Sequence, residues 1–291
     1  LTVSFVGEVF QELSTQIHAS LQHALARPET VDPVVRPFFL WIINVLQQND
    51  LLVMDSGGEW TLRPTDLPPA QSIWRTLLRD YPENLPELVL SSRTGRELAG
   101  LIRSSLTGES LARKLRHNHQ YELLFNDSPS YVGTRFAIQN ILQTLAADWP
   151  VHRRLRVLEI IAGSNASVEH VVTEVPGVQL DYVVASANAE VHSHLQAEYD
   201  GHPFVVVVKA EGDALDLVAV DAIPEHFDVI ILEHVLHRSN HAPSALTALR
   251  RRLAKSGLLI LAERHPDMVA DFIFGLDAAW WRTSQSGAVI A

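Results

Sequence analysis

The feature that most constrains the fold is a series of five apolar runs that alternate with helical segments in the second half of this 291-residue chain. The runs span residues 155–161, 179–185, 204–209, 227–232 and 257–263. Helix-favouring segments lie at 165–173, 188–199, 242–254 and 267–281. Strands that are apolar along their whole length are typical of a parallel sheet covered by helices on both faces. We therefore expect a doubly wound α/β core with ligand sites at the carboxyl ends of its strands.

The first half of the chain is mainly helical in pattern. Residues 34–46 carry a wide apolar face at helical spacing. Two short strands around a Gly-Gly turn then predict a winged-helix-like hairpin near 51–62. Further helices are expected at 70–80, 85–92, 95–105, 108–125 and 130–149. We expect two domains, a helical subdomain at 1–150 and the α/β core at 151–291.

The composition excludes several classes of function. The net charge of −11 repels phosphate backbones, so no nucleic acid partner is expected. No apolar run is long enough to span a bilayer, and the first residues do not resemble a signal peptide, so no membrane partner is expected. The absence of cysteine excludes disulfides, thiolate catalysis and cysteine-ligated metals, and it fits the cytoplasm, the expected location.

The 14 histidines raise the question of a metal site. His192 and His194 lie two positions apart on an expected helix, so their side chains point to different faces. The chain contains no His-Glu-x-x-His pattern. We expect no metal site.

Several motifs of the second half resemble a known family. They are Leu155–Ser167, Phe227–His237, Ser256–Glu263 and Phe274–Trp281. In this order they resemble the methyltransferase domain of modular polyketide synthases, of the C-methyltransferase type. Residues 124–129 resemble a motif of that family's helical lid. The resemblance implies a mostly parallel, Rossmann-like methyltransferase core that follows a mainly helical lid.

The same resemblance implies a chemistry and its partners. Members of the family use S-adenosylmethionine to methylate the α-carbon of a β-ketoacyl chain on an acyl carrier protein, and some methylate oxygen instead. The expected partners are therefore an acyl carrier protein and neighbouring synthase domains. The family's sheet ends with an antiparallel hairpin, and we expect those C-terminal strands to be missing here or the domain to be incomplete.

The cofactor loop departs from the family pattern Glu-x-Gly-x-Gly-x-Gly. Glu159 opens the matching segment and Gly163 is retained, but Ile161 and Asn165 replace the first and third glycines. Glycine allows the tight turn and the close approach of a cofactor, whereas a β-branched residue disfavours positive φ. The alternative interpretation, which we favour, is an ordinary strand-to-helix turn capped by Ser164 or Asn165.

A second departure affects the nucleoside. The resemblance implies an acid at the end of the second strand that holds the ribose hydroxyls, and Ala185 occupies that position. A methyl group cannot accept those hydrogen bonds, each of which is worth about 1.5–3 kcal/mol when it involves a charged group. Glu211 could replace the family's acid at the adenine end after the third strand, although a polar loop also contains acids by chance.

The catalytic pair that the resemblance implies is present. His237 follows the fourth expected strand and Glu263 ends the fifth, and neighbouring strands lie about 4.8 Å apart. A histidine with a pKa near its usual value of about 6.5 suits removal of a proton from carbon, and the glutamate would fix its tautomer. The alternative is a His–Glu hydrogen bond that stabilises a loop. His234 replaces an asparagine that is common in the family.

Three hypotheses follow. The first is a degenerate pseudo-methyltransferase that binds no cofactor and has a structural role in a polyketide synthase. The second is an active enzyme with S-adenosylmethionine as cofactor, which methylates carbon or oxygen. The third is a module that binds an acyl chain or another ligand without the cofactor.

Overall fold

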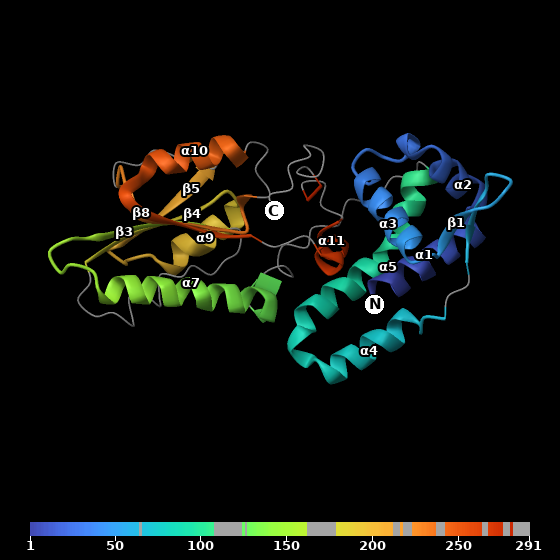
Figure 1. The fold of residues 1–291 in the computed structure, drawn as a ribbon, viewed down its shortest axis with the longest axis horizontal. Helices are drawn as coiled ribbons and strands as arrows, with labels where there is room; N and C mark the ends of the chain where they lie inside the picture. Colours follow the sequence, from blue (N-terminus) through green and yellow to red (C-terminus); the bar gives the residue numbers. More distant parts are fainter. Residues whose placement is uncertain are drawn as a thin grey trace. The chain divides into compact units, whose positions relative to one another are not determined.

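The computed structural model describes residues 1–63, 66–107, 124–125, 127–161, 179–211, 216–217, 223–236, 242–263, 267–275 and 280–281. The chain divides into two compact units, Leu1–Gln120 with Pro266–Ala291, and Tyr121–His265 (Figure 1). These units differ in extent from the expected domains 1–150 and 151–291. The helix before the sheet belongs to the sheet's unit, and the last segment belongs to the helical unit.

The first unit is mainly helical. Its helices are α1 (Thr2–Gln16), α2 (His18–Ala26), α3 (Arg36–Gln48), α4 (Ala70–Asp80), α5 (Leu85–Thr107) and α11 (Met268–Phe274), with short 3-10 turns at Pro28–Thr30 and Pro82–Asn84. Strands β1 (Leu52–Met54) and β2 (Trp60–Leu62) pair antiparallel, with Val53 opposite Thr61. Gly58 takes a φ of 81° in the turn, a conformation that glycine adopts without strain. The hairpin expected near 51–62 is therefore confirmed.

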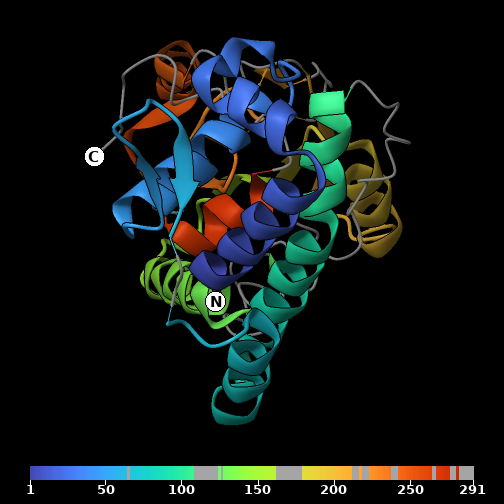
Figure 2. The same cartoon turned by 90° about the vertical axis from the view of Figure 1, so that its right-hand side faces the viewer.

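The prediction of separate helices at 85–92 and 95–105 is wrong. Helix α5 runs unbroken through Gly95, alongside α1 (Figure 2). A β-carbon at Gly95 would lie 2.4 Å from the ring of Phe5 on α1. Glycine is therefore needed for the close approach of the two helices, and packing outweighs its weak helix propensity.

Helix α11 is tied to the N-terminal helices by an aromatic cluster. The Phe272 ring lies 6.0 Å from Phe5 and 6.4 Å from Trp41, measured between ring centroids. The Asp271 carboxylate accepts hydrogen bonds from the indole nitrogens of Trp41 at 3.0 Å and Trp280 at 2.9 Å. Of the helix expected at 267–281, residues Met268–Phe274 are helical, and residues 276–279 lie outside the described residues.

The second unit contains a six-stranded sheet of order β6-β5-β4-β3-β7-β8. Its strands are β3 (Leu155–Ile161), β4 (Leu180–Ser186), β5 (Val205–Glu211), β6 (Asp216–Leu217), β7 (Phe227–Glu233) and β8 (Leu253–Ala262). Only β6, which was not predicted, is antiparallel to its neighbour among these described strands. The strand order reverses between β3 and β7, which confirms the doubly wound α/β core.

Helices cover both faces of this sheet (Figure 1). Helices α7 (Pro129–Ala147) and α9 (Ala189–Glu198) pack on the face that carries Val157 and Ile231. Helix α10 (Ala242–Arg252) packs on the opposite face against Leu158 and Ile230. Strand β8 begins at Leu253, earlier than the expected residue 257, and a register irregularity on β7 between Phe227 and Val229 accompanies the extra residues. The helices expected at 108–125, apart from residues 124–125, and at 165–173 lie outside the described residues.

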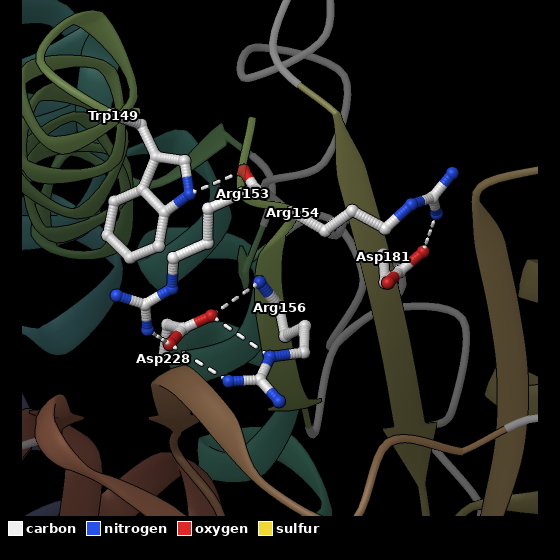
Figure 3. Close-up of polar contacts among 6 residues, drawn as sticks. All are labelled: Trp149, Arg153, Arg154, Arg156, Asp181 and Asp228. Carbon is white, nitrogen blue, oxygen red and sulfur yellow. Dashed lines mark hydrogen bonds and ion pairs between the residues drawn. The ribbon is translucent and has the colours of Figure 1, made fainter. Parts of the chain in front are cut away.

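Arginine–aspartate pairs tie the amino ends of three strands together (Figure 3). Buried Asp228 on β7 accepts from Arg156 on β3 at 3.1 and 3.2 Å and also pairs with Arg153. Arg154 pairs with Asp181 on β4. Burial acts to raise the pKa of Asp228, but hydrogen bonds and charge from Arg156 and Arg153 outweigh it and lower the pKa.

Within the described residues, no helix is both long and apolar enough to cross a bilayer.

Candidate cofactor and catalytic site

The candidate site lies at the carboxyl ends of β3, β4, β7 and β8. Parallel doubly wound sheets bind ligands where the strand order reverses, which here is between β3 and β7. At this edge the Cα of Ile161 pairs with that of Glu233, which in turn pairs with Ala262. The expected site residues on these strands therefore lie near one edge, and the sheet positions each of them.

Glu159, the acid that opens the expected cofactor motif, is enclosed by the core. It is fully buried on β3, and its Oε2 accepts a hydrogen bond of 2.8 Å from the Tyr182 hydroxyl on β4. Burial, followed by the charge of Glu159, raises the pKa of Tyr182 well above its ordinary value. Tyr182 therefore stays a neutral donor, and at least one oxygen of Glu159 is committed inside the sheet.

Ile161 continues β3 where the family pattern would start a glycine turn. Its side chain is buried and packs in the cluster that α7 and α9 cover. The non-glycine residues with positive φ within the described chain are Asp50 and His234, so Ile161 has ordinary extended backbone. Gly163 and Asn165 lie outside the described residues, and the predicted alteration of the turn itself stays a prediction.

Ala185 is a core residue at the end of β4. It is fully buried, its Cα pairs with Ile160 and Val208, and it belongs to the cluster on the α10 face. The next residue, Ser186, uses its Oγ to accept a 3.3 Å hydrogen bond from the backbone amide of Asn188. Residues 185–189 contain no acid, and the first acid after β4 is Glu190 in the first turn of α9. Glu211 is the last residue of β5, on a strand and not in a loop.

The structure describes one residue of the expected catalytic pair. Glu263 follows β8, and its Oε1 accepts a 2.6 Å hydrogen bond from the backbone amide of Leu236, the residue before His237. His237 lies outside the described residues. Strands β7 and β8 are neighbours, as predicted, so the structure brings Glu263 to the segment that leads into His237.

His234 begins this segment in a strained conformation. Its φ is 55°, which is uncommon for a non-glycine residue. Its amide donates to the Ala262 carbonyl at 2.8 Å, and its ring lies 4.6 Å from that of Tyr131 and 6.1 Å from that of Phe125, between centroids. Such strain is often found at functional sites and persists where surrounding contacts enforce it.

The sequence of the chain is similar to parts of known polyketide synthases. No family model matches it. It is 23% identical over 292 residues to the non-reducing polyketide synthase ausA of Aspergillus calidoustus, and 21% identical over 293 residues to mapC of Penicillium brevicompactum. Each alignment covers 97% of this chain and 12% of the relative, so the chain spans about an eighth of those synthases.

The matching solved structures show the fold. The CurJ carbon methyltransferase aligns with a TM-score of 0.74 at 21% identity, over 97% of this chain and 76% of that one. The CMeT domain of the citrinin polyketide synthase aligns at 0.76 and 18%, over the same shares. Along its length the chain is similar in sequence to a region of non-reducing polyketide synthases, and it shares the fold of polyketide synthase carbon methyltransferase domains. The trans-methyltransferase CalH, solved with SAH, aligns at 0.62 and 15% over 99% of this chain and 76% of that one.

The candidate site contains a buried acid that sequence analysis missed. Glu233 ends β7 and is 6% exposed, and among the described residues its Oε2 has no hydrogen-bond partner. Burial, and then the charge of Glu159, raises the pKa of Glu233 to about 7, although Arg135 acts to lower it. The sequence signal for Glu233 was an ionisable residue directly after an apolar strand.

No group of three potential metal-ligating side chains occurs within the described part of the chain.

Proposed function

We propose that this domain is a non-catalytic pseudo-methyltransferase of a polyketide synthase, in which S-adenosylmethionine binding is degraded and the fold has a structural role. The observation that carries the proposal is the end of β4. Ala185 is enclosed in the core there, and residues 185–189 supply no carboxylate. Several hydrogen bonds to the ribose would be lost, each worth about 1.5–3 kcal/mol.

The end of β3 supports the same proposal independently. Buried Ile161 extends this strand in place of the family's first glycine, and the expected change at Asn165 affects the following turn. The close backbone approach that glycine permits would then be lost on the methionine side of the cofactor. We propose that no cofactor is bound, and that Glu211 at the end of β5 does not compensate for these losses.

The proposed structural role places the domain among its neighbours in a larger synthase. The aligned relatives are about eight times longer than this chain, as expected for multidomain proteins. We propose neighbouring synthase domains and an acyl carrier protein as partners, in the cytoplasm, with residues 1–150 as a lid subdomain.

Methyl transfer tests this proposal directly. The domain would be incubated with S-adenosylmethionine and a β-ketoacyl thioester of an acyl carrier protein, and the acyl chain would be weighed by mass spectrometry. The CurJ carbon methyltransferase with its own substrate serves as the positive control. We expect no added methylene mass on the acyl chain. Transfer that disappears in His237→Ala would overturn the proposal.

One observation favours an active S-adenosylmethionine-dependent C-methyltransferase, or an O-methyltransferase, as the second candidate. Glu263 contacts the backbone directly before His237, as a residue that positions a catalytic histidine would. In this candidate His237 removes the proton from the α-carbon, Glu263 orients it, and Glu211 contributes to nucleoside binding. S-adenosylmethionine supplies the methyl group.

A further inference from the structure

Arg135 is the first component of a polar cluster inside the second unit. It shares a stripe of α7 with Tyr131, Ile138 and Leu142, and the latter three side chains are buried. Its Nη2 donates a 2.8 Å hydrogen bond to the backbone carbonyl of Phe125. Its Nε is buried, and among the described residues it has no hydrogen-bond partner. The guanidinium therefore retains a donor that a second acceptor could use.

Glu233 is the second component, at the carboxyl end of β7. Its buried Oε2 is an acceptor without a hydrogen-bond partner among the described residues. The ionisable groups around it, one from each neighbouring element, are Glu159 on β3, Tyr182 on β4, Glu263 after β8, Arg135 on α7 and the adjacent His234. Arg135 carries the permanent positive charge of this set. An ionised Glu233 would therefore be repelled by Glu159 and attracted by Arg135.

We propose that these residues form a proton-linked latch: when the carboxyl group of Glu233 releases its proton to solvent, the Arg135 guanidinium turns, so that its Nε donates to the Glu233 carboxylate and its Nη2 releases the Phe125 carbonyl. The inference concerns the sheet edge itself and does not depend on whether the domain is catalytic. The latch needs no co-reactant, because a single proton moves between a carboxyl group and water.

The latch acts on the segment that leads to His237. Phe125 and Tyr131 pack their rings on His234, whose φ of 55° requires support from its surroundings. When Arg135 releases the Phe125 carbonyl, the contact of the Phe125 ring with His234 weakens. The pKa of Glu233, raised to about 7 by burial and by Glu159, places this change near neutral pH.

The direction of the effect follows from proton linkage. The pKa of Glu233 rises from 4.5 to about 7 in the fold, so the described arrangement binds a proton that an opened state releases. The stability that protonated Glu233 gives to the described arrangement is complete below pH 4.5 and is lost as the pH rises through 7. Hydrogen-exchange protection at the start of α7, for example at the Val132 amide that donates to Ser128, should therefore decrease with pH.

The experiment compares protection factors, corrected for intrinsic exchange, between pH 6 and 8.5 in the intact chain. We expect protection over residues 128–135 to fall about tenfold in the wild type and to stay constant in Glu233→Gln, which cannot ionise. Asp181→Asn changes a residue at the opposite, amino end of the strands, and it should keep the wild-type pH dependence of protection. Equal pH dependence in wild type and Glu233→Gln, or none in the wild type, would overturn the latch.

A second measurement does not require a folded variant. The ¹⁵Nε resonance of Arg135 in the wild type should shift with a midpoint near pH 7 as its partner changes. A resonance that stays constant from pH 6 to 8.5 would also overturn the latch.

Discussion

At the scale of single residues, Asp228 shows how a buried charge is tolerated in this fold. Its side chain is 3% exposed, whereas its partners Arg153 and Arg156 are 50% and 32% exposed (Figure 3). The Arg156 backbone amide also donates to it, at 3.1 Å. The desolvation of one carboxylate is therefore offset by several charge-assisted hydrogen bonds that join β3 to β7.

Asp228→Asn should destabilise the protein. It removes the charge that organises both arginines, and we expect a loss of about 2–3 kcal/mol in the free energy of unfolding at pH 7, measured in urea. Asp181→Asn is the matched control, since its pair with Arg154 is more exposed, and it should cost at most about 1 kcal/mol. Equal losses in the two variants would contradict this account.

The Asp228 effect should also depend on pH. Arg156 and Arg153 lower the pKa of Asp228 in the folded protein below its usual value of 3.8. The stability that the carboxylate adds is therefore present above pH 3.8 and is lost as the pH falls through the folded pKa. In urea titrations, the stabilities of wild type and Asp228→Asn should converge below that pH. A difference that stays constant down to pH 2 would argue against the pairing.

At the scale of helices and strands, apolar patterns in the sequence predicted where the elements lie. They did not predict where packing outweighs local propensity. Strand β3 occupies the predicted residues because its mostly apolar side chains, interrupted by Arg156 and Glu159, are buried on both faces of the sheet. Helix α5 is a single helix where two were expected, because contact with Phe5 is a long-range reason to keep Gly95 inside it. Such reasons are not contained in a local sequence window.

Two glycines of α5 provide a matched test of this explanation. Gly95→Ala would place a β-carbon 2.4 Å from the Phe5 ring, and we expect it to destabilise the protein by about 1–3 kcal/mol through overpacking. A β-carbon at Gly100 meets nothing within 4 Å, so Gly100→Ala should stabilise by about 0.5–1 kcal/mol. Both effects would be measured by thermal and urea unfolding. Stabilisation by Gly95→Ala would contradict the proposed close approach.

At the scale of the whole molecule, the chain returns to its first unit after completing the second. Pro266–Ala291 groups with Leu1–Gln120, and Asp271 contributes by accepting from Trp41 and Trp280. The sequence contains aromatic residues in this segment, but a local pattern could not pair them with residues more than two hundred positions earlier. The N-terminal helical unit therefore depends on the last part of the chain.

Asp271→Ala should weaken the first unit selectively. Two indole donors lose their acceptor, at a cost of about 2–3 kcal/mol in that unit. Hydrogen exchange should speed up in α3 and α11, while protection in β3 and β7 of the second unit is retained. An equal loss of protection in both units would show that they unfold together.

The site was partly predictable from sequence. Glu263 and its neighbourhood followed from strand order, because adjacent carboxyl ends bring their residues together. Glu233 did not, since its raised pKa depends on burial and on Glu159, which belongs to another strand. His234 likewise gave no signal of its positive φ, which long-range contacts with Tyr131 and Ala262 enforce.

The most direct test of the account is calorimetric titration of the isolated 291-residue chain with S-adenosylmethionine, and in parallel with its demethylated product. The account predicts no saturable heat at millimolar ligand, because in the proposed function Ala185 removes contacts to the ribose and Ile161 removes contacts on the methionine side of the cofactor. Saturable binding of either compound with micromolar affinity would contradict it.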